Sequence, residues 1–100
     1  MLSLKPGVTA RGIQPELLLA LLALDGIYQH AGYPLVITAL TDGKHMEGSL
    51  HYKGRAADFR TRDIPIPVVN LIIKNTKDAL GGDYDIVLES DHGHLEFDSK

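Results

Sequence analysis

The chain contains no cysteine, which excludes disulfides, thiolate metal sites and cysteine nucleophiles. Any metal must therefore be held by nitrogen and oxygen ligands. Long apolar runs are also missing: the longest extends from Leu17 to Leu24, far short of the about 20 residues of a membrane-spanning helix. The first residues, Met1 to Pro6, lack the pattern of a secretory signal. We therefore expect no membrane partner, and synthesis and retention in the cytoplasm unless another factor releases the protein.

A strong charge of one sign is likewise missing. The formal net charge is −3 over 100 residues, and acidic and basic residues are interspersed. No basic stripe indicates nucleic acid as a partner. Arg55, Arg60 and Arg62 form a short local cluster, which we interpret as a solvated strand face or a substrate-facing patch.

Length and apolar content favour a single domain over residues 1–100, because 100 residues with 44% apolar content support one small core. Residues 1–14 are predicted to be an N-terminal arm. The apolar patterns that follow predict, in order, a helix from Pro15 to about His30, strands over Leu35–Leu40 and Ala56–Thr61, a helix from Pro65 to Leu80, and strands over Tyr84–Glu89 and His94–Asp98. Leucine occupies nearly every face of the first helix, so we expect that helix to be well buried. This order favours an α+β fold with a small, mainly antiparallel sheet covered by helices.

Strand alternation brings two candidate metal ligands onto polar faces. Asp58 lies between the core candidates Ala57 and Phe59, and His94 precedes the core candidate Leu95. If the two strands are close in the sheet, Asp58 and His94 converge on one ion. His51 must reach the same point from the preceding loop. Three protein ligands with an open fourth position are typical of a catalytic zinc site.

A nearby carboxylate is a candidate general base. Asp91 precedes His94 by three residues, a spacing that places the two side chains on opposite faces of an unbroken strand. A turn or bulge at His92-Gly93 would bring Asp91 to the metal side, where it could accept a proton from water. The alternative is an aspartate that caps backbone N–H groups in a turn.

The same acid-to-histidine spacing occurs twice, which leaves the register open. Glu89 and His92 repeat the spacing of Asp91 and His94. His92 could share a face with His94 and stabilise charge on a tetrahedral intermediate, or it could be a solvent-exposed histidine. Glu96 could orient a metal ligand from outside the coordination shell.

Two segments together resemble a known family. Ser-x-His-x-x-Gly-Arg-Ala-x-Asp (Ser49 to Asp58) and Asp-x-x-His-x-Glu (Asp91 to Glu96) are similar to the motifs of the M15 zinc peptidases, which include D-alanyl-D-alanine carboxypeptidases and phage L-alanyl-D-glutamate endolysins. The resemblance implies the hedgehog/DD-peptidase fold and one zinc ion per chain. It makes His51, Asp58 and His94 the zinc ligands and Asp91 the catalytic base, and so selects this register over Glu89 and His92.

The resemblance also indicates where substrate binds. Ser49 corresponds to the family serine near the site, with a role in substrate contact or loop support. Many relatives carry Tyr-Arg-Ser after the strand that corresponds to Leu35–Leu40, but this chain has Thr41-Asp42-Gly43-Lys44-His45. Either Lys44 or His45 takes the place of the missing arginine in binding the substrate, or substrate recognition differs from that of the family. His92 is a further candidate contact.

These expectations lead to one preferred function and two alternatives. The preferred function is a zinc metallopeptidase that hydrolyses peptide bonds of peptidoglycan stem peptides and acts at the bacterial cell wall after release or virion delivery. The first alternative is a non-catalytic zinc-binding module of a virion or of cell-wall binding. The second is an intracellular peptidase or amidase that acts on small D-amino-acid peptides.

Overall fold

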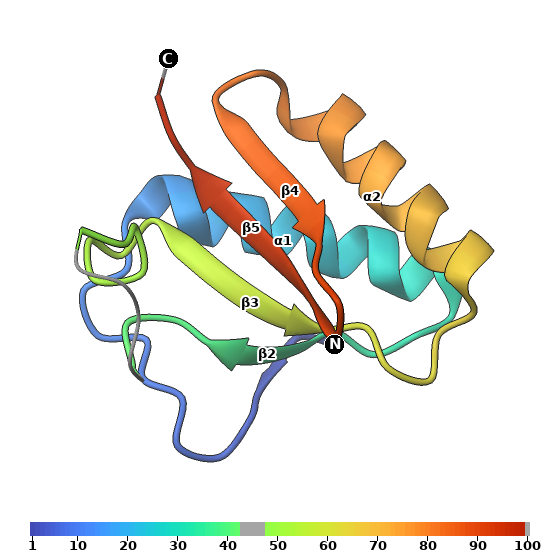
Figure 1. Ribbon diagram of the computed structural model, residues 1–100, viewed down its shortest axis with the longest axis horizontal. Coiled ribbons are helices and arrows are strands. Elements are labelled where there is room, and N and C mark those ends of the chain that lie inside the picture. The colour runs from blue at the N-terminus through green and yellow to red at the C-terminus, as the bar shows by residue number, and fades with distance from the viewer. Residues whose placement is uncertain (43–47, 100) are drawn as a thin grey trace.

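The computed structural model describes residues 1–42 and 48–99, and within them the chain forms an α+β fold (Figure 1). The elements in chain order are β1 (Ser3–Leu4), α1 (Pro15–Ala31), β2 (Val36–Ala39), β3 (Ala56–Arg60), α2 (Ile66–Leu80), β4 (Tyr84–Leu88) and β5 (His92–Phe97). The predicted helices and four of the five strands are confirmed. The short β1, within the predicted arm, was not expected, and β5 begins two residues earlier than predicted.

The five strands form one sheet in the order β1-β2-β3-β5-β4. All neighbouring pairs are antiparallel except β1 and β2, which are parallel. The sheet is therefore mostly antiparallel, as predicted. Figure 1 shows α1 crossing behind the sheet, and α2 packs against α1 and β4. In the described part of the chain, no helix covers the opposite face of the sheet.

The core lies between the sheet and the two helices. Strand alternation places Ala57, Phe59 and Leu95 in this core, while Asp58 and His94 lie on the other face. The interior is completed by residues from β2, β4 and both helices, including Leu17, Leu24, Ile37, Ile72 and Ile86. The predicted assignment of core and polar faces in β3 and β5 is therefore confirmed.

The helix α1 begins at Pro15, whose missing N–H costs nothing in the first turn. It ends at Gly32, which adopts the left-handed conformation (φ 90°) that terminates helices. The prediction that this helix is well buried holds for one of its sides only, because Leu18, Leu19 and Leu22 are exposed. A domain of this size covers only one side of a helix, and that side carries the buried residues Leu17, Ala20, Leu21, Leu24 and Tyr28.

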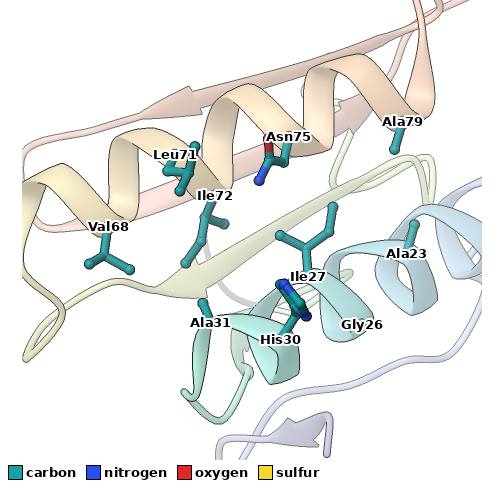
Figure 2. Close-up of a pocket in the computed structure, with 10 residues that line it drawn as sticks. All are labelled: Ala23, Gly26, Ile27, His30, Ala31, Val68, Leu71, Ile72, Asn75 and Ala79. Carbon is teal, nitrogen blue, oxygen red and sulfur yellow. The ribbon is translucent and has the colours of Figure 1, made fainter.

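An apolar groove of about 620 Å³ runs between α1 and α2. Figure 2 shows Ile27 of α1 and Ile72 of α2 facing the space between the helices, with His30 and Asn75 as the polar side chains among those that line it. This groove lies on the helix side of the sheet. Among the described residues, no helix is long and apolar enough to cross a bilayer.

Gly93 has a packing role that the sequence analysis did not anticipate. It pairs with Phe59 across β3 and β5, and a Cβ at residue 93 would overlap the Phe59 ring. A turn or bulge at His92-Gly93, which would have brought Asp91 to the metal side, is not formed, because both residues lie in regular β5. The chain reverses just before them, where the backbone N–H of Glu89 donates to the carbonyl oxygen of His92 (2.8 Å).

Candidate metal centre

The centre of the sheet brings two candidate ligands into direct register. β3 and β5 are neighbours, and Asp58 pairs with His94. Both side chains project from the face without helices, since their strand neighbours fill the core. The Nδ1 atom of His94 lies 2.9 Å from Oδ1 of Asp58. The convergence predicted from strand alternation is therefore confirmed.

His51 reaches the same carboxylate from the turn before β3. Its side chain is buried, with a residue exposure of 3%, and its Nδ1 lies 2.8 Å from the carbonyl oxygen of Leu40. A carbonyl oxygen only accepts, so Nδ1 carries a proton, and Nε2 is the ring nitrogen that faces the carboxylate. That Nε2 lies 3.3 Å from Oδ1 of Asp58. With Nδ1 held by the backbone, Nε2 is the nitrogen of His51 that would bind a metal ion in place of a proton.

Gly54 allows the turn before β3 to bring His51 close to Asp58. It has φ 71°, and a Cβ at this position would overlap the carbonyl of Gly12. The carbonyl oxygen of Gly54 also accepts a hydrogen bond from the backbone N–H of Gln14 (2.8 Å). Only glycine fits such a close backbone contact at positive φ. The turn that carries His51 is thus fixed against the N-terminal arm.

The three groups fit a divalent ion. One ligand atom from each of His51, Asp58 and His94 lies within 4.8 Å of the other two, so the group could hold a metal ion. No metal-capable group among the described residues contains Glu89 or His92. The register that makes His94 the ligand is therefore favoured over the one that uses Glu89 and His92.

Electrostatics tie Asp58 and His94 together. Burial alone would raise the pKa of Asp58, but hydrogen bonds from His51 and His94, with the nearby imidazole charges, lower it well below its usual range. The hydrogen bond to Asp58 raises the pKa of His94; burial opposes this, and a second hydrogen bond to Glu96 adds to it. In the metal-free protein, the ionised carboxylate of Asp58 and the protonated form of His94 therefore stabilise each other.

Glu96 lies behind His94, at the position expected of an orienting residue. Its Oε1 accepts a hydrogen bond from Nε2 of His94 (2.8 Å). With Nε2 protonated, Nδ1 is left to act as the ligand atom, the arrangement found when a carboxylate orients a metal-binding histidine. Glu96 also belongs to a second acidic group with Asp85 and Asp98 that the sequence analysis missed. Asp85 and Glu96 are paired across β4 and β5, a topology that the sequence pattern does not reveal.

The Asp91-His92 pair borders the centre. Nδ1 of His92 donates to Oδ1 of Asp91 (2.6 Å), and Nε2 of His92 lies 3.8 Å from Oδ1 of Asp58. His92 therefore shares a face with His94, which was the first of the two alternatives that the sequence left open for this residue. Asp91 does not contact the three ligands, and its side chain is 85% exposed. Asp91 is therefore linked to the three ligands only indirectly, because the imidazole of His92 lies between its carboxylate and Asp58.

Three further residues were predicted to contact the substrate: Ser49, Lys44 and His45. Oγ of Ser49 accepts a hydrogen bond from the backbone N–H of His51 (3.2 Å), which supports the turn that holds this ligand. Lys44 and His45 lie outside the described residues.

A polar pocket of about 340 Å³ opens beside the centre. It is lined by Lys5, Thr38, Ala39, Asp58, Arg60, Arg62, Asp91 and His92. The arginine cluster seen in the sequence is divided, since Arg55 lies over the ring of Phe97 (5.9 Å to the centroid) and only Arg60 and Arg62 line this pocket. Lys5 was not foreseen, because its position depends on the pairing of β1 with β2.

Comparison with known protein families, curated proteins and solved structures found no match. Interpretation of the centre therefore rests on the residues themselves and on their arrangement.

Proposed function

We propose that this chain is a zinc-dependent peptidase with the hedgehog/DD-peptidase fold, which hydrolyses a peptide bond in peptidoglycan stem peptides. The observation that carries the proposal is the convergence of His51, Asp58 and His94 within 4.8 Å beside an open polar pocket. The first and second motifs of the M15 resemblance supply these three residues. If phage-encoded, the protein would act at the cell wall after release or virion delivery.

Each residue has a proposed role. His51, Asp58 and His94 would hold one zinc ion, which when bound would polarise the scissile carbonyl and lower the pKa of water to about 7. Asp91 would be the general base that accepts a proton from water and returns it to the leaving amine. Its hydrogen bond to His92 supports a shared role, because the imidazole lies between Asp91 and the three ligands.

The test combines metal content with digestion of cell walls. Purified protein should contain about one zinc per chain under this ligand set, and the zinc-loaded protein should release peptide fragments from purified sacculi. Mass spectrometry of the new termini identifies the bond. Asp91→Asn should retain zinc and fold but lose at least about 100-fold in kcat, the usual contribution of a general base.

One observation favours the non-catalytic alternative. The side chain of Asp91 is 85% exposed and makes no contact with the ligands, so the chain could bind zinc without hydrolysing peptides. In that case wild-type protein would hold zinc but leave sacculi intact, and Asp91→Asn would change nothing. Free dipeptides tested beside sacculi separate the wall enzyme from an intracellular peptidase or amidase.

A further inference from the structure

Three cationic side chains line the pocket beside Asp58. Lys5 follows β1, Arg60 is the last residue of β3, and Arg62 follows it closely. Over residues 1–42 and 48–99, none of the three takes part in an ion pair. The chain as a whole is acidic, with a net charge of −3. The carboxylates of Asp58 and Asp91 also line this pocket, but they bond to His94 and His92 and form no ion pair with the three cations. A group of cations without ion-pair partners indicates a site for an anion.

The backbone of Arg60 is held in place next to the metal centre. Asp58 and Arg60 lie on the same face of β3, about 7 Å apart along the strand, and Arg60 pairs with His92 across the sheet. The buried Tyr28 donates a hydrogen bond from its hydroxyl to the carbonyl oxygen of Arg60 (2.8 Å). The ring of Tyr28 packs edge-on against Phe59. This arrangement fixes the base of the arginine side chain before any ligand binds.

The other wall of the pocket is equally defined. The backbone N–H of Lys5 donates to the carbonyl oxygen of Ile37 (2.9 Å), which places Lys5 beside β2. Ala39 is the β2 residue opposite Asp58, and its small side chain leaves room above the sheet. A substrate bound at the centre would therefore extend between β2 and β5 toward the three cations.

We infer that Lys5, Arg60 and Arg62 form an anion subsite that binds a substrate carboxylate on the residue adjacent to the scissile bond. The inference rests on the proposed function and specifies which peptides are cut. Asp58 and Arg60 are separated by about two residues of strand. The peptide residue next to the scissile bond and the side chain of Arg60 are together long enough to cover this distance. Arginine suits this role because its guanidinium binds carboxylates through two parallel hydrogen bonds.

The carboxylate has two possible sources, a free C-terminus or an acidic side chain. They are compared with three matched peptides: acetyl-D-alanyl-D-alanine, its C-terminal amide, and acetyl-L-alanyl-D-glutamate with its α-carboxyl amidated. Analogues with CH₂–NH in place of the scissile amide bind without being hydrolysed. Their affinities for the zinc-loaded protein are measured by calorimetry, and KM and kcat are measured on the parent peptides.

One carboxylate analogue should bind about 10-fold more tightly than the uncharged amide, in line with a charge-assisted hydrogen bond, and the preferred analogue identifies the source. Arg60→Gln and Arg62→Gln should reduce this preference and raise KM while leaving zinc content unchanged. Arg60→Lys should retain part of it. Lys77→Gln removes the same charge from an exposed position on α2 and should have no effect.

Equal affinities for carboxylate and amide, or a preference that persists unchanged in the Arg60→Gln/Arg62→Gln double variant, would overturn the subsite. In the second case the metal alone selects the carboxylate. If no peptide is hydrolysed but the arginine-dependent preference is present, the subsite stands and the proposed function fails. If peptides are hydrolysed but carboxylate and amide analogues bind equally well, the proposed function stands and the subsite fails.

Discussion

Replacing Gly93 by alanine should destabilise the fold, although the change adds only one methyl group. The new Cβ would overlap the ring of Phe59, which is fully buried and packs edge-on against Tyr28 with ring centroids 6.0 Å apart. Overpacking of this kind costs about 1–3 kcal/mol, and relief of the glycine penalty in a strand returns up to about 1 kcal/mol. Because the ring has no free space, the cost should fall in the upper part of its range, and we expect a net loss of about 1–2 kcal/mol. A typical domain has about 5–15 kcal/mol of stability in total.

Urea unfolding of the metal-free protein, followed by far-ultraviolet circular dichroism, measures this loss. Gly26→Ala is the matched control, since a Cβ there meets nothing within 4 Å and alanine favours a helix. It should stabilise the protein by about 0.5–1 kcal/mol. Combining Gly93→Ala with Phe59→Leu should cost at least about 1 kcal/mol less than the sum of the single changes. Additive costs, or a loss below about 1 kcal/mol for Gly93→Ala alone, would refute the packing argument.

Three further predictions concern the metal centre. His51→Ala and His94→Ala should each reduce zinc content from about one per chain to near zero by elemental analysis, whereas Glu89→Gln should leave it unchanged; a loss in the Glu89 variant would move the site to the rival register. Glu96→Gln should weaken zinc binding about 10–100-fold in a competition assay with a chelator, because the orienting carboxylate of His94 is lost, and an unchanged affinity would contradict that role. Since the folded-state pKa of His94 is raised, its imidazolium stabilises the metal-free fold below the unfolded value of about 6.5, and this contribution is lost as the pH rises through the folded value. Metal-free stability should therefore fall from about pH 6.5 upward while zinc affinity rises, and a metal-free stability that increases over the same range would exclude this linkage.

Strand periodicity predicted that Asp58 and His94 lie on the polar faces of their strands, and they meet because β3 and β5 are neighbours in the sheet, the condition on which the prediction depended. Ala57, Phe59 and Leu95 are strongly apolar, so they fix which face of each strand enters the core and leave the two ligands on the other face. The proline and glycine residues at the ends of the helices predicted the helix boundaries equally well, because their effect on the backbone is local. Predictions that depended on short-range chemistry were therefore confirmed.

Features that depend on long-range pairing were missed. β1 has only two residues, too few to show any period, and its position is set by β2. Lys5 enters the pocket only as a result of that pairing. Gly93 was considered only as part of a possible turn or bulge, whereas here its missing side chain accommodates Phe59. The exposure of Leu19 (65%) could not be read from a helix with leucine on nearly every face.

The three ligands come from positions 51, 58 and 94, so a cation bound between them would act as a reversible cross-link between the turn before β3 and the C-terminal strand. In a chain without cysteine, that link takes the place of a disulfide, with its closure governed by metal supply instead of redox state. Protease resistance of the folded chain should then follow zinc availability. A chelator would loosen β5 in any compartment, whether oxidising or reducing.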